Sequence, residues 1–74
     1  MPHIKVKCYK GRTPEQLQEI AQKIADAATE AFGAKPGTVS VSIEPVDKED
    51  WKAVYDNEIY GEKEHLLVEP QYKM

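Results

Sequence analysis

Pro2 is the residue of this chain with the most unusual chemical potential, because it becomes the N-terminus once Met1 is removed. An N-terminal proline carries a secondary amine where an internal proline has an amide nitrogen, and such an amine can act as a general base or as a nucleophile. The alternative is that proline stands second by chance. Position alone favours that alternative, so support for catalysis must come from the rest of the chain.

Arg12 and Trp51 are the two candidates for binding a substrate. Arg12 precedes a helix start, where its guanidinium could clamp a carboxylate, assisted by the helix N-terminus. Its simpler interpretation is a solvated side chain. Trp51, the only tryptophan, is by default an anchor for a short helix, but it could instead form an apolar wall that lowers the pKa of a neighbouring amine.

The elements that must position these residues begin with a strand over residues 3–9. There Ile4, Val6 and Cys8 alternate with polar side chains, and this period of two predicts one buried face. A helix should follow, because Thr13 is a favourable N-cap, Pro14 suits the first helical position and Gln16 can complete a capping box. Gly33 is the expected C-cap. The helix should pack through one apolar face, formed by Leu17, Ile20, Ala21, Ile24, Ala28, Ala31 and Phe32.

A second strand is predicted from the alternation of Val39, Val41 and Ile43, and Pro45 is expected to end it. Strand, long helix and strand form a β-α-β unit, which pairs the strands in parallel. We therefore predict a small α/β (α+β) fold with one long helix on the sheet. Two strands are too few to stand alone, so oligomerisation is expected to extend the sheet.

The remaining residues are expected to form short C-terminal helices and an arm. Asp47 should cap the first helix, with Trp51, Val54 and Tyr55 on its inner side. A second short helix is expected within residues 58–68, although Gly61 disfavours it. Residues 69–74 are predicted to be an extended arm that docks on a neighbouring subunit.

Composition excludes several classes of function. The 74 residues are expected to form a single domain, 1–74, near the lower size limit for a self-sufficient core. A net charge of −3 without a basic run argues against a nucleic-acid partner. No stretch has the roughly 18 to 20 apolar residues of a membrane span. The single cysteine excludes an internal disulfide and fits a cytoplasmic protein, and the two histidines lack the spacing of metal ligands.

The predicted topology separates Pro2 from Arg12. The loop that carries Arg12 follows a parallel strand and so lies at its carboxyl end, the usual ligand edge of such sheets. Pro2 begins the same strand. The two residues could meet only across a subunit boundary, or if the loop folds back.

Several features of the sequence, in this order, resemble the 4-oxalocrotonate tautomerase family. They are Pro2 at the head of a strand, the Gly-Arg-Thr-Pro-Glu-Gln segment at 11–16, the alternating strand 39–43 and the later aromatic Trp51. The resemblance covers the whole chain. Residues 49–72 look most like a bacterial subgroup of slightly longer tautomerases that form dimers, so the resemblance implies a homodimer, with a hexamer as the alternative.

The resemblance implies a cofactor-independent isomerase that moves a proton between the oxygen and carbon of an enol. It makes Pro2 the general acid/base, Arg12 the ligand of the substrate carboxylate, often from a neighbouring subunit, and Trp51 a wall of the site. A second family arginine aligns with Ser40 here. Its loss disfavours a dicarboxylate such as 2-hydroxymuconate and favours an enol with one carboxylate, for example an aryl-enolpyruvate.

The expected mechanism requires a neutral amine at Pro2. An apolar pocket and a nearby arginine both disfavour the ammonium form, and neither a metal nor an organic cofactor is expected. Two alternatives remain open. One is hydration or dehalogenation of an unsaturated acid at the same site, and the other is a non-catalytic oligomeric binding protein. Retention of Met1 would make Pro2 a tertiary amide and exclude the enzyme hypothesis.

Overall fold

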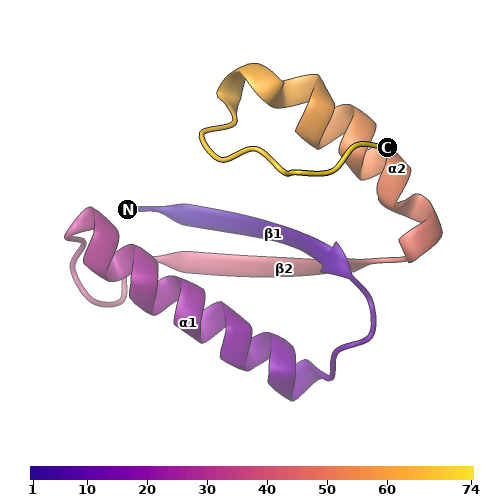
Figure 1. Cartoon of the computed structure of the whole chain (residues 1–74). Coiled ribbons are helices and arrows are strands. Elements are labelled where there is room, and N and C mark those ends of the chain that lie inside the picture. The colour runs from indigo at the N-terminus through magenta and orange to yellow at the C-terminus, as the bar shows by residue number, and fades with distance from the viewer.

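The computed structural model describes residues 1–74, and its architecture is a β-α-β unit followed by short helices (Figure 1). The elements are β1 (His3–Tyr9), α1 (Pro14–Phe32), β2 (Ser40–Val46) and α2 (Trp51–Val54). β1 and β2 form a two-stranded parallel sheet in which Val6 lies opposite Ile43. The predicted fold class and strand pairing are therefore confirmed.

The ends of α1 form as the sequence predicts. The backbone nitrogen of Gln16 donates to Thr13 Oγ1 at 3.1 Å, and the backbone nitrogen of Thr13 donates to Gln16 Oε1 at 2.9 Å, which completes the capping box. Gly33 ends the helix in the left-handed region at φ 62°. One part of the predicted packing face is wrong: Ala31 is exposed and Phe32 is 70% exposed, because the last turn of α1 extends past the end of the strand pair (Figure 1).

Pro45 does not end β2, which continues to Val46. The backbone nitrogen of Ser40 donates to the Pro2 carbonyl oxygen at 3.2 Å, so the even-numbered nitrogens of β2 face β1. Backbone donors alternate along a strand, and the nitrogen of Pro45 therefore faces the open edge of the sheet. A proline at this position costs no hydrogen bond within the sheet, and the strand passes through it.

Residues 48–65 form what we call the C-terminal helical segment. It begins with a 3₁₀ turn at Lys48–Asp50, continues through α2 and a π-helical turn at Tyr55–Ile59, and ends with 3₁₀ turns at Tyr60–His65. The helical prediction is correct in outline, but Leu66 and Leu67 lie beyond the helix end. Asp47 precedes the first turn without capping it through its side chain; its Oδ1 lies 3.3 Å from Lys10 Nζ instead.

Residues 66–74, the C-terminal arm, have no regular secondary structure and fold back along the C-terminal helical segment of the same chain (Figure 1). Only Ala28, Val54 and Tyr55 are buried, so the chain by itself does not enclose a core. No helix combines the length and the apolar character needed to cross a membrane.

Candidate functional site

Arg12 and Trp51, the two predicted substrate-binding residues, line one pocket of about 480 Å³, which we call the Arg12 pocket. It lies where the carboxyl end of β1 meets α2 and the C-terminal arm. Its lining residues are Lys7, Cys8, Tyr9, Arg12, Trp51, Tyr72 and Met74. None of these side chains carries a carboxylate, and the two charged side chains at this site, those of Lys7 and Arg12, are both cations.

Arg12 reaches this pocket because the chain turns sharply after β1. Gly11 adopts a φ of 132°, which a side chain would strain, and Thr13 then starts α1. Arg12 is exposed and takes part in none of the ion pairs of the structure. Its guanidinium therefore keeps all its donors for an anion.

Trp51 is fixed from two sides. Its ring meets Tyr9 edge to face, with the ring centroids 5.1 Å apart and the planes at 83°. Its Nε1 donates a hydrogen bond to the hydroxyl oxygen of Tyr72 at 3.1 Å. Sequence reasoning did not select either tyrosine. Tyr9 had a signal, as an aromatic at the end of a strand next to the Arg12 loop, whereas nothing in the sequence linked Tyr72 to Trp51.

Lys7 is the other cation of the Arg12 pocket, and Glu58 of the C-terminal helical segment forms an ion pair with it. Hydrogen bonding to Glu58 raises the pKa of Lys7 above its ordinary value, so this amine stays protonated at neutral pH. Lys7 cannot act there as a general base. Arg12 is left as the cation without a partner in the pocket.

Pro2 lies at the other end of β1 and does not line the Arg12 pocket. At about 3.3 Å per residue, the seven residues of β1 separate Pro2 from the Arg12 loop by roughly 20 Å. The structure thus agrees with the topology argument that one chain does not bring these residues together. Pro2 is half-buried.

Ser40 lies beside Pro2 in the neighbouring strand. Its hydroxyl is 2.7 Å from Nδ1 of His3, and the two residues are paired in register. The position where the family resemblance places a second arginine thus carries a neutral hydroxyl that already has a partner. No other cation replaces it in a contact with Ser40.

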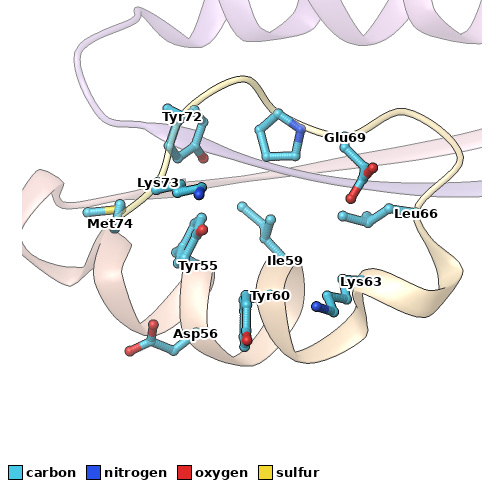
Figure 2. Close-up of a pocket in the computed structure, with 11 residues that line it drawn as sticks. Tyr55, Asp56, Ile59, Tyr60, Lys63, Leu66, Glu69, Tyr72, Lys73 and Met74 are labelled. Atoms are coloured by element: carbon cyan, nitrogen blue, oxygen red, sulfur yellow. The ribbon is translucent and has the colours of Figure 1, made fainter.

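A second pocket, of about 520 Å³, lies between the C-terminal helical segment and the C-terminal arm, and we call it the arm pocket (Figure 2). Tyr55, Ile59 and Tyr60 line it from the helical side. Tyr72 and Met74 line both the arm pocket and the Arg12 pocket. The C-terminal arm is therefore a shared wall between the two pockets.

The chain is similar in sequence to known tautomerases over its whole length. The family model described as "Tautomerase enzyme" matches residues 2–57. The chain is 38% identical over 76 residues to Tautomerase PptA from Enterobacter sp. (strain 638), with both chains covered completely. Proteins of the same name from Escherichia coli O127:H6 and Shigella sonnei are 33% and 32% identical over 75 residues, again over the full length of both chains.

Proposed function

We propose, since this chain belongs to the tautomerase family, that it catalyses keto-enol proton transfer on a small 2-oxo or enol monocarboxylate such as an aryl-enolpyruvate. As a member of this family the chain is an enzyme, a cofactor-independent isomerase. In the proposal Pro2 is the general acid/base after removal of Met1. Arg12 binds the carboxylate and Trp51 forms an apolar wall. We place the reaction in the cytoplasm, where the single cysteine would stay reduced.

One observation carries the choice of substrate. Arg12 is an unpaired cation in a pocket that is lined by aromatic side chains and by no carboxylate side chain. Such a pocket suits a ligand with one carboxylate and an apolar body. Ser40 adds no second cation near Pro2, which disfavours a substrate with carboxylates at both ends.

The proposed site is shared between two subunits. Arg12 of one chain would approach Pro2 of another, since a single β1 holds them about 20 Å apart. The open edges of the two-stranded sheet and the three buried residues support association, because both leave surface for a partner to cover. We propose a homodimer as the active form; a hexamer would satisfy the same geometry.

The proposed reaction transfers one proton out and one proton back. The neutral amine of Pro2 takes the proton of the enol hydroxyl, and the oxygen electrons form the carbonyl bond. The electron pair of the carbon-carbon double bond then takes a proton from the Pro2 ammonium, which restores the neutral amine. Arg12 holds the carboxylate so that the enol lies within reach of the amine.

The direct test is ketonisation of an aryl-enolpyruvate by the native enzyme, followed by ultraviolet absorbance, with intact mass measured on the same sample. We expect turnover well above the uncatalysed rate in protein that has lost Met1. Greater turnover of an unsaturated acid by hydration or dehalogenation would favour that alternative reaction. Carboxylate binding without any turnover would favour a non-catalytic binding protein.

Replacing Ser40 by arginine is expected to change the substrate preference. The new guanidinium would lie beside Pro2, where it could bind a second carboxylate, and we expect the ratio of kcat/KM for 2-hydroxymuconate over an aryl-enolpyruvate to rise about tenfold or more. Ser42→Arg is the matched control, since Ser42 lies two residues further along β2, opposite Lys5. An equal rise in both variants, or none in Ser40→Arg, would contradict the assignment of this position.

A further inference from the structure

We propose that Tyr72 of the C-terminal arm is a further substrate-binding residue, whose hydroxyl donates a hydrogen bond to the carboxylate held by Arg12. The inference deepens the proposed function and rests on it for the identity of the ligand. Residues 66–74 lie beyond the part of the chain matched by the family model, which ends at residue 57. The role is therefore assigned from the contacts of this chain.

The hydrogen bond between Trp51 and Tyr72 leaves the hydroxyl proton of Tyr72 unused. Trp51 Nε1 is a donor only, so in its 3.1 Å contact with Tyr72 the phenol oxygen accepts. A phenol that accepts in this way still has its own proton to donate. The Tyr72 hydroxyl makes no other hydrogen bond within the chain. Its donor is therefore not used within the chain, and Tyr72 is one of the residues that line the Arg12 pocket.

The chemistry of the pocket indicates the acceptor. Arg12 and Tyr72 both line the Arg12 pocket, and no aspartate or glutamate side chain lines it to accept from either residue. An anionic oxygen is the acceptor that both donors share, and hydrogen bonds to a charged oxygen are the strong ones. A carboxylate has two oxygens, so one can accept from the guanidinium while the other accepts from the Tyr72 hydroxyl.

The packing of Tyr72 shows how its hydroxyl is held for this task. Its ring lies 5.8 Å from that of Tyr55, centroid to centroid, with the ring planes tilted by 40°, and Figure 2 shows Tyr72 on the arm next to Tyr55 on the helical segment. Tyr55 is one of the three buried residues, so it is a firm support. The Trp51 hydrogen bond then fixes the hydroxyl end. Tyr72 is thus held at both ends although its side chain remains 45% exposed.

This arrangement assigns separate roles within the Arg12 pocket. Arg12 and Tyr72 bind the carboxylate and Lys7 is paired with Glu58, whereas Tyr9, Trp51 and Met74 are left to contact the apolar body of the ligand. The pocket would select for a carboxylate over a neutral group of the same shape. If Tyr72 binds the carboxylate, its loss should affect the acid more than the neutral analogue, whereas a purely structural role would affect both ligands equally.

The test is the binding of phenylacetate and of its neutral analogue phenylacetamide to the native oligomer, measured through the fluorescence of Trp51. Trp51 is the only tryptophan and lines the pocket, so its emission reports occupancy directly. We expect Tyr72→Phe to weaken phenylacetate binding about ten- to a hundredfold and to weaken phenylacetamide binding much less, because a hydrogen bond to a charged oxygen is stronger than one to a neutral carbonyl. Phenylalanine keeps the ring packing on Tyr55.

Tyr60→Phe is the matched control. Tyr60 also stacks on Tyr55, at 6.4 Å, but it lies outside the Arg12 pocket, so this variant should bind both ligands like the native protein. Three results would overturn the inference: no binding of phenylacetate to native protein, unchanged affinity in Tyr72→Phe, or an equal loss for the acid and the amide. Phenylacetate is not turned over, so failure of the isomerase proposal would appear separately, as absent ketonisation with Tyr72-dependent binding intact.

Discussion

Replacement of Pro2 by alanine is expected to lower kcat/KM for ketonisation of an aryl-enolpyruvate by about 10²- to 10⁴-fold, the usual contribution of a positioned general acid or base. The fold should be unaffected, since the Pro2 side chain is only half-buried and its carbonyl, which accepts from Ser40, is retained. Residual activity is expected from the primary amine of alanine. Ultraviolet absorbance measures the rate, and circular dichroism checks the fold.

Two further measurements sharpen this prediction. Protein that retains Met1 should be inactive, because its Pro2 nitrogen is a tertiary amide without basicity, and intact mass identifies this form. In processed protein kcat/KM should rise with pH as the Pro2 ammonium loses its proton. Pro36→Ala, in the loop before β2, is the control and should keep full activity. Full activity of Pro2→Ala would rule out the proline mechanism. A pH profile that gives the Pro2 amine an apparent pKa well above about 9 would also contradict it, because too little free base would remain at neutral pH; an ordinary α-amino group has a pKa of about 7.7 to 8.0.

Replacement of Arg12 by alanine should lower kcat/KM by about 10- to 100-fold, mainly through a higher KM, because the substrate carboxylate loses a charged partner in both the ground state and the transition state. Lys10→Ala is the matched control: it removes a cation from the same loop, but one that is paired with Asp47 rather than directed to the pocket. Steady-state kinetics on both variants separate a specific contact from a general loss of positive charge.

Mixing two defective variants tests whether the site is shared. In a heterodimer of Pro2→Ala and Arg12→Ala chains, one of the two sites would combine an intact Pro2 with an intact Arg12 from the other chain. After random exchange of subunits we expect activity to recover to about a quarter of the native value, as the symmetry of a dimer requires. No recovery, despite subunit exchange verified by mass spectrometry, would place Pro2 and Arg12 of the same chain in one site.

The parts of this structure that could be predicted are those encoded by local patterns. The alternation in β1 and the capping box from Thr13 to Gln16 depend on residues close in sequence, and both formed as expected. Phe32 was misplaced because periodicity predicts which face of a helix is apolar but not how far the partner surface extends. Pro45 was misplaced because the cost of a proline depends on whether its nitrogen faces a neighbour or an open edge.

The candidate site could be predicted only in part for a similar reason. Arg12 and Trp51 were selected by residue type and position, and the structure places them in one pocket. The pairing of Lys7 with Glu58 and the hydrogen bond from Trp51 to Tyr72 join residues 51 and 21 positions apart. Contacts over such separations follow from the path of the whole chain, and no local pattern encodes them.

The orientation of Pro45 also bears on how copies of this protein avoid uncontrolled aggregation. An exposed strand edge is a template on which further strands can add without limit. The nitrogen of Pro45 faces that edge without a hydrogen to donate, so a strand arriving along β2 finds a gap in the row of donors. We therefore expect pairing along this edge to favour the stretch before Pro45 and growth of a continuous ribbon to be disfavoured. Pro45 thus leaves the outer edge of β2 available to a short partner strand while disfavouring the addition of strands into a fibre.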